Sequence, residues 1–144
     1  MPHETLLKFN YPNTLLREYT HWAVLLRPQQ VTVGSLVLVC RSEATSMAEV
    51  SAEAFTELQT VTADLEGTLK QVFAFDKINY LLLMMVDRHV HFHVIPRYAT
   101  PRTVDGVEFP DRVWPRPPDV TQALDLTEQQ FAELFQLLQT AWPT

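Results

Sequence analysis

The segment DRHVHFHVIPRY, residues 87–98, decides the fold, because it predicts an extended strand with three alternating histidines. Alternate side chains of a strand point to one face, so His89, His91 and His93 are expected to stand in a row on a strand at about residues 89–96. The apolar residues between and after them can enter a core on the opposite face. Three polar imidazoles on one strand face indicate a functional site.

Four apolar stretches upstream of the histidines predict the other strands of a sheet. YTHWAVLL and SLVLVCR are separated by Pro28 and Gly34, which favour a turn and an antiparallel pair. KINYLLLMMV is expected to join the histidine strand tightly at Asp87 and Arg88, and TLLREY to add an edge strand. Pro96 lacks an amide proton, so it should end the histidine strand or leave it at an edge. The expected strands cover residues 14–19, 19–26, 35–41, 77–86 and 89–96.

Two helices are predicted from apolar residues spaced three or four positions apart. The first spans residues 51–72 and begins at an N-cap serine. The second spans residues 127–142, where Thr127 and Gln130 are expected to form a capping box. Helices combined with antiparallel strands in this order favour one α+β domain over residues 1–144.

An irregular, stiff segment at about residues 96–120 holds six of the ten prolines. Three uses fit such a segment: a flap over a site, a surface for a partner, or a cover for the sheet. The sequence leaves all three open.

Composition and charge narrow the class of protein. The chain has 144 residues, of which 47% are hydrophobic and 19% charged, as is usual for a globular domain with a sizeable core. The net charge of −6 disfavours non-specific attraction to nucleic acid or an anionic membrane, so any phosphate must be bound locally. Only three glycines are present, too few for a phosphate-binding P-loop or a dinucleotide fingerprint.

The sequence predicts a cytoplasmic location. Cys40 has no partner for an internal disulfide and lies in an apolar run, which favours a buried structural thiol in a reducing compartment. The first residues do not resemble a secretory signal, and the longest apolar stretch, residues 81–86, is too short to span a bilayer.

Three interpretations of the histidine row are chemically open. One or two of the histidines can be structural, with satisfied hydrogen bonds. A metal site is the second, but successive same-face residues are about 6.7 Å apart, whereas zinc binds nitrogen at about 2.0–2.1 Å. Three collinear histidines therefore converge poorly on one ion, although two of them could do so with a third ligand from His21, Asp76 or Asp87.

The third interpretation is nucleophilic catalysis. A neutral imidazole can attack phosphorus and form a covalent phosphoramidate that water later opens. The usual histidine pKa of about 6.5 leaves much of the imidazole neutral near pH 7. A row of three suits one attacking ring and two helpers.

HVHFHVI, residues 89–95, resembles the His-x-His-x-His signature of histidine-triad (HIT) nucleotide hydrolases and transferases, and the resemblance to a bacterial-type branch extends over most of residues 19–98. It implies a HIT-like fold with about five strands and two main helices, a homodimer and a small-molecule nucleotide substrate. It also implies that His91 is the nucleophile that cleaves an α-phosphate linkage through a nucleotidyl-histidine, while His89 and His93 hold phosphate and orient the attacking ring. No cofactor is required, although Mg²⁺ can accompany a polyphosphate.

The surroundings of the motif depart from the family pattern. Many members carry Gly-Gln-Ser or Gly-Gln-Thr where this chain has Val-Asp-Arg at residues 86–88, and better-known members have a fourth histidine where this chain has Ser35. Arg88 is a candidate for supplying the missing positive charge, and Asn79 is a candidate for contacting phosphate or ribose. The position of a ribose-binding Asn or Asp falls near Arg27, so that role is not carried over.

These departures motivate an alternative from a different class of protein. The chain could be a nucleotide- or metal-binding module that has kept the site but lost efficient turnover. Of the remaining polar residues, Arg97 and Arg102 follow the motif and could reach an anionic substrate, but they are expected to be solvated at the surface. His3 and His21 have no spacing that connects them to the row.

Overall fold

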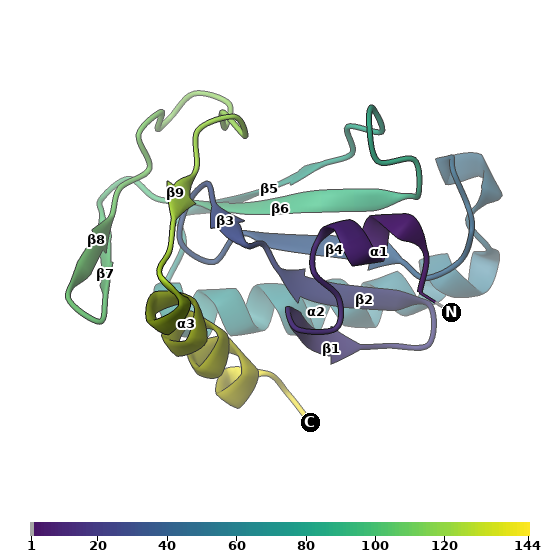
Figure 1. Ribbon diagram of the computed structural model, residues 1–144, viewed down its shortest axis with the longest axis horizontal. Coiled ribbons are helices and arrows are strands. Elements are labelled where there is room, and N and C mark those ends of the chain that lie inside the picture. The colour runs from purple at the N-terminus through teal and green to yellow at the C-terminus, as the bar shows by residue number, and fades with distance from the viewer. Residues whose placement is uncertain (1) are drawn as a thin grey trace.

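In the computed structural model, which describes residues 2–144, five antiparallel strands form one central sheet (Figure 1). In their order across the sheet the strands are β1 (Leu15–Glu18), β2 (Trp22–Leu26), β4 (Leu36–Cys40), β6 (His91–Arg97) and β5 (Lys77–Leu81). Every neighbouring pair is antiparallel, which confirms the predicted α+β class. The apolar strands β2 and β4 are buried at every position, because both faces of the sheet are covered there.

Three α-helices accompany the sheet, α1 (Glu4–Lys8), α2 (Ala52–Phe73) and α3 (Glu128–Ala141), together with a short 3-10 helix, η1 (Met47–Glu49). The predicted caps of the long helices are confirmed. The Ser51 hydroxyl accepts a hydrogen bond from an amide in the first turn of α2, and Thr127 and Gln130 form both bonds of a capping box on α3. The one-turn helix α1 was not predicted, because it is too short to show a helical apolar period.

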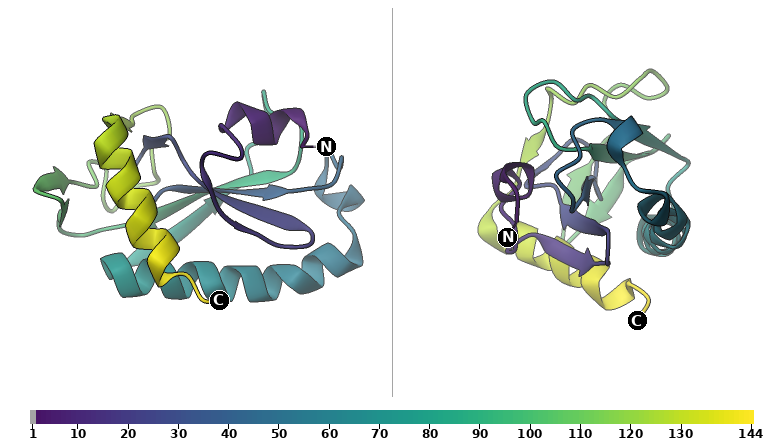
Figure 2. Two further views of the ribbon diagram at one scale, coloured as in Figure 1. Left: turned by 60° about the horizontal axis from the view of Figure 1, so that its bottom comes forward. Right: turned by 90° about the vertical axis from the view of Figure 1, so that its right-hand side faces the viewer.

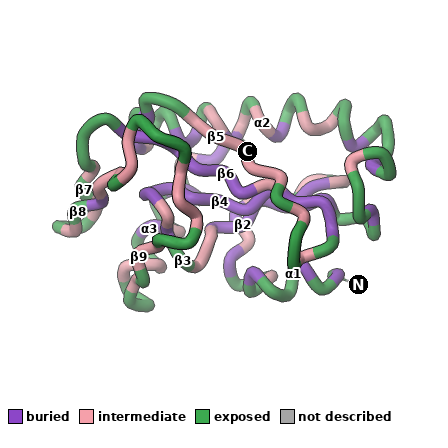
Figure 3. Tube along the Cα trace, turned by 90° about the horizontal axis from the view of Figure 1, so that it is seen from above, coloured by how far each residue is buried: buried purple, intermediate pink, exposed green. Residues whose placement is uncertain are grey.

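The two faces of the sheet are covered by different elements, as Figure 2 shows with α1 and α2 on opposite sides. The larger core lies between the sheet and the helices α2 and α3, and it includes Trp22, Leu65 and Leu138. The smaller core lies under α1, where Leu6 and Phe9 meet inward side chains of β2 and β4. Figure 3 shows that the central strands are buried, whereas the connections at both ends of the sheet are exposed.

The predicted strand at residues 77–86 is wrong at its C-terminal end. β5 ends at Leu81, and residues 82–90 form an irregular connection to β6 rather than the expected tight turn. Met84 has a φ of 48°, a left-handed conformation that does not continue a strand. Leu82 and Met84 still pack against the main core, but Met85 and Val86 are each 85% exposed, so the end of the apolar run lies at the surface. Apolar composition alone does not distinguish a strand from an apolar surface loop.

Pro96 lies inside β6, which continues one residue further to Arg97. The pairing of β6 with β4 ends at Val94, so Pro96 has a strand neighbour only in β5. The Pro96 carbonyl accepts a hydrogen bond from the Thr32 hydroxyl at 2.5 Å. The Pro96 nitrogen, which carries no proton, therefore faces the side beyond the end of β4, where no ladder hydrogen bond is lost.

Part of the proline-rich segment is regular. β7 (Arg102–Val104) pairs with β8 (Val107–Phe109), and further along the chain β9 (Leu124–Asp125) pairs with β3 (Gln29–Gln30). Figure 1 shows these short pairs at one end of the sheet, while the connection from β5 to β6 lies at the other.

Candidate functional site

The three histidines of the row are all buried, beside the short helix α1. His91 and His93 belong to β6, whereas His89 precedes the strand by two residues. The ring centroids of His91 and His93 lie 5.2 Å apart, and the ring of Phe9 packs within 6 Å of both. Strand alternation thus places the His91 and His93 rings side by side, as the sequence pattern predicts.

The hydrogen bonding of His91 fixes which ring nitrogen is free. Its Nδ1 lies 2.7 Å from the backbone carbonyl oxygen of His89. A carbonyl oxygen only accepts, so Nδ1 carries the proton of the neutral ring and Nε2 keeps the lone pair. His91 is therefore prepared to act as a nucleophile or a ligand through Nε2.

A pocket of about 310 Å³ opens beside His91 and His93. Its other walls come from the end of α1, from the turn after β2, and from the connection between β5 and β6. The lining residues are Lys8, Phe9, Arg27, Gln29, Leu83, Met84, Met85, Val86, Asp87, His91 and His93. Among these described residues none comes from the proline-rich segment, residues 96–120. The pocket combines an apolar wall with two cationic side chains and one carboxylate.

His93 is held in its neutral form. Burial, and to a lesser extent the nearby positive charge of Arg27, lower its pKa to about 4. At pH 7 the ring is therefore uncharged. Its Nδ1 is buried and has no hydrogen-bond partner among the described residues.

His89 does not line the pocket. Its Nδ1 lies 3.0 Å from the Thr5 hydroxyl, and its Nε2 lies 3.3 Å from the Glu43 carboxylate. The ring also stacks on His3, with centroids 3.8 Å apart and an interplanar angle of 6°. These contacts hold His89 in place. Its backbone carbonyl orients the His91 ring, so His89 acts on the site through its backbone.

His3 belongs to the surroundings of the site, contrary to the expectation that it is unconnected to the row. Its Nε2 donates to the Cys40 carbonyl at 2.7 Å, and its Nδ1 accepts the amide of Leu6, which caps α1. Burial lowers the pKa of His3, which favours this neutral, singly protonated ring. No local pattern links His3 to a residue 86 positions away, so only the fold brings it to His89.

Asp87 and Arg88, which precede the histidine row, form ion pairs with α1. Asp87 lies 2.9 Å from the Lys8 ammonium group. Arg88 is largely exposed, its Nε lies 3.6 Å from the Glu4 carboxylate, and it is not among the residues that line the pocket. Contact between Arg88 and a substrate stays a prediction.

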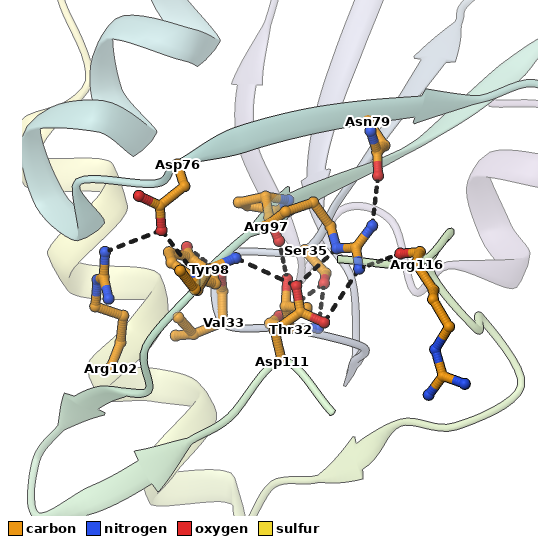
Figure 4. Close-up of polar contacts among 12 residues, drawn as sticks. Thr32, Val33, Ser35, Asp76, Asn79, Arg97, Tyr98, Arg102, Asp111 and Arg116 are labelled. Atoms are coloured by element: carbon orange, nitrogen blue, oxygen red, sulfur yellow. Dashed lines mark hydrogen bonds and ion pairs between the residues drawn. The ribbon is translucent and has the colours of Figure 1, made fainter. Parts of the chain in front are cut away.

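Asn79 lies outside the pocket, on β5, where its Oδ1 accepts a hydrogen bond from Arg97 at 2.9 Å (Figure 4). Arg97 is buried rather than solvated, because Asp111 pairs with its guanidinium group at 2.7 Å and the Arg116 carbonyl accepts from it as well. The expectation of a surface position is wrong for Arg97. Arg102 also contacts the protein, donating to the Phe73 carbonyl.

Ser35 is fully buried and has a structural role. Its hydroxyl donates to the Thr32 carbonyl at 2.7 Å and accepts from the Thr32 amide at 3.0 Å, so it closes the turn before β4. The Gln30 side chain accepts from the amides of Gly34 and Ser35 in the same turn. Ser35 is not among the residues that line the pocket.

Over residues 2–144, no cluster of three or more His, Cys, Asp or Glu side chains has the arrangement of a metal site. In the same residues, no helix is both long enough and apolar enough to span a membrane. Cys40 is a buried free thiol, as predicted.

The HIT domain family model matches residues 10–100 of this chain. A comparison with curated protein sequences finds no match.

Solved structures of histidine-triad proteins are similar to this one over nearly its full length. A histidine triad protein from Bradyrhizobium japonicum superposes with a TM-score of 0.75 at 20% identity, covering 99% of this chain and 97% of the other. One from Marinobacter aquaeolei VT8 gives 0.68 at 25% identity, covering 99% and 95%. A hypothetical histidine triad nucleotide-binding protein from Sulfolobus tokodaii gives 0.68 at 15% identity, covering 95% and 88%.

Proposed function

This chain belongs to the HIT domain family, and we propose that it is a nucleotidyl hydrolase or transferase that cleaves an α-phosphate linkage through a covalent nucleotidyl-His91 intermediate. Its substrate would be a dinucleoside polyphosphate, a nucleoside phosphoramidate or an adenylate. The similarity to the hypothetical nucleotide-binding protein from Sulfolobus tokodaii supports a nucleotide in the pocket.

One observation carries the proposal, the 2.7 Å contact between His91 Nδ1 and the His89 carbonyl. It leaves the Nε2 lone pair available for attack. As Nε2 bonds to phosphorus, positive charge develops on the ring and strengthens the hydrogen bond from Nδ1 to the carbonyl. The same contact therefore orients the nucleophile and stabilises the product of its attack.

The proposed reaction has two displacements at the α-phosphorus. In the first, His91 Nε2 forms a bond to phosphorus, and the bond to the leaving group breaks with its electron pair going to that group. In the second, a water oxygen or an acceptor hydroxyl replaces Nε2, loses its proton to solvent and returns the lone pair to the ring. Hydrolysis releases a nucleoside monophosphate.

The intermediate is the sharpest test of this proposal. We expect wild-type protein, quenched with base during turnover of a labelled adenylyl substrate, to carry one adenylyl group that acid removes. His91→Ala should carry none and should turn over at least about a thousandfold more slowly. Intact-protein mass spectrometry with product analysis measures both.

His21→Ala is the matched control for the labelling experiment, because His21 lies outside the pocket lining. It should retain the adduct. Turnover of His91→Ala at the wild-type rate would rule out His91 as the nucleophile.

A binding module without efficient turnover is the second candidate function. The observation that favours it is the carboxylate of Asp87 in the pocket, since a negative charge repels phosphate, although Lys8 at 2.9 Å offsets part of that charge. Nucleotide binding by the wild type with neither adduct nor product would support this candidate. Stoichiometric zinc in chelator-washed protein would point instead to metal binding by the histidines.

A further inference from the structure

Two buried nitrogens beside the pocket lack hydrogen-bond partners. They are His93 Nδ1 and Arg27 Nε, and they are the buried side-chain polar atoms left unpartnered among residues 2–144. Both residues line the same pocket. A buried polar nitrogen without a partner is costly, so two of them on residues that line one pocket indicate a place where a ligand supplies hydrogen-bond partners.

The register of the sheet places Arg27 beyond His93, on the side away from His91. Leu25 lies opposite Val37, and Val37 lies opposite His93, so these three share a face of the sheet. Arg27 follows Leu25 by two positions, which returns it to that face about 7 Å further along. β2 runs parallel to β6, because each is antiparallel to β4 between them. The pocket is therefore lined in the order His91, His93, Arg27.

Among residues 2–144, no carboxylate pairs with Arg27, the second cation of the pocket. Lys8 pairs with Asp87, the one carboxylate of the lining. Within the described residues, the Arg27 side chain donates to one acceptor, the backbone carbonyl of Gln29 at 2.6 Å. A half-buried guanidinium group with one neutral acceptor has donors to spare for an anion, and its planar fork matches phosphate oxygens.

We propose that Arg27 and His93 form a second anion subsite, which binds a phosphate group of the substrate other than the one attacked by His91. This inference rests on the proposed function, which places the α-phosphate at His91. It narrows the substrate class to nucleotides with at least two phosphate groups. The second phosphate lies either in the 5′ chain or on the sugar.

Binding to the His91→Ala protein tests the subsite without turnover. Calorimetric titration would use AMP, ADP and adenosine 3′,5′-bisphosphate. At least one of the two-phosphate nucleotides should bind about tenfold or more tightly than AMP, and Arg27→Gln should abolish that advantage while changing AMP binding less than about twofold. A preference for ADP assigns the second phosphate to the 5′ chain, and a preference for the bisphosphate assigns it to the sugar.

Arg112→Gln is the matched control, because Arg112 is exposed and outside the pocket lining. It should keep the advantage of the two-phosphate nucleotide. Equal binding of all three nucleotides before substitution, or an equal loss for all three in Arg27→Gln, would overturn the subsite. Failure of the proposed function is distinguishable, since it would appear as wild-type protein without an adenylyl adduct while the binding preference persists.

The pKa of His93 in the presence of nucleotide is a second test, because an arginine with only a structural role would not change it. A phosphate bound between Arg27 and His93 should raise the pKa of His93, because the negative charge favours the imidazolium form. NMR of His91→Ala should therefore show a larger rise in this pKa with the preferred two-phosphate nucleotide than with AMP. The same rise with both nucleotides would count against the subsite.

Discussion

At the scale of single residues, His93 contributes both to the candidate site and to the stability of the fold. Its ring is buried, and Arg27 lies close enough to disfavour its protonation, so its pKa is lowered to about 4. The unfolded chain binds a proton at the ordinary pKa of about 6.5. His91 lies on the same strand with its Nε2 free, so the two rings have different tasks: one is placed to attack, and the other to present an uncharged nitrogen to a ligand.

A pH dependence of stability follows from His93. Its lowered pKa contributes stability that is fully present above about pH 6.5 and is lost as the pH falls towards 4, because the unfolded chain takes up the proton first. We expect the free energy of unfolding to fall by up to about 3 kcal/mol across this window. Urea unfolding at a series of pH values measures it. His93→Asn should flatten the profile, and an unchanged slope would contradict this assignment.

At the scale of elements, the short helix α1 supports the histidine strand. His3, at its N-terminus, stacks on His89, and Thr5 contacts the same ring. Lys8 and Phe9, at its other end, line the pocket. The connection of residues 82–90 contributes another wall, made of the apolar residues 83–86 and of Asp87.

His3→Ala tests whether α1 positions the nucleophile. It removes the stack on His89, the hydrogen bond to the Cys40 carbonyl and the cap of α1, which should cost about 1–3 kcal/mol of stability. The turnover number should fall more than KM changes, because His91 loses orientation while no residue of the pocket lining is replaced. Steady-state kinetics and urea unfolding measure the two effects.

Leu7→Ala is the control for this helix, since Leu7 is 55% exposed. It should change neither stability nor turnover appreciably. An equal fall in turnover for both variants would indicate a general loosening of α1 rather than a specific role of His3.

At the scale of the whole molecule, a buried ion pair ties the proline-rich segment to the sheet. Arg97 of β6 and Asp111 are both nearly inaccessible, and Asn79 and the Arg116 carbonyl complete the hydrogen bonding of the guanidinium group (Figure 4). The segment is thereby anchored away from the candidate pocket. Its use by a partner, the homodimer and the cytoplasmic location stay predictions.

Asp111→Asn should destabilise the protein by about 3–5 kcal/mol, because it leaves the buried charge of Arg97 uncompensated. Urea unfolding of the variant measures the loss. Asp125→Asn, at an exposed position of β9, is the control and should change stability by less than about 0.5 kcal/mol. A loss in Asp111→Asn no larger than in this control would show that the ion pair contributes little.

Particular residues show which features of the fold a local sequence pattern predicts and which it does not. Ser51, Thr127 and Gln130 were predicted as caps, because capping depends on residues three positions apart. The predicted end of β5 is wrong, because an apolar loop and a strand can have the same composition over ten residues. Arg97 was expected at the surface, because its partner Asp111 lies 14 residues away in a segment without regular pattern.

By itself the sequence determined the α+β class, the alternation that puts His91 beside His93, and the family, because these depend on periodicity and on one short motif. Only the tertiary structure decided that His89 lies behind the pocket rather than in it, and that His3 and Arg27 join the histidines. Those contacts connect residues far apart along the chain, and side-chain packing between elements sets them.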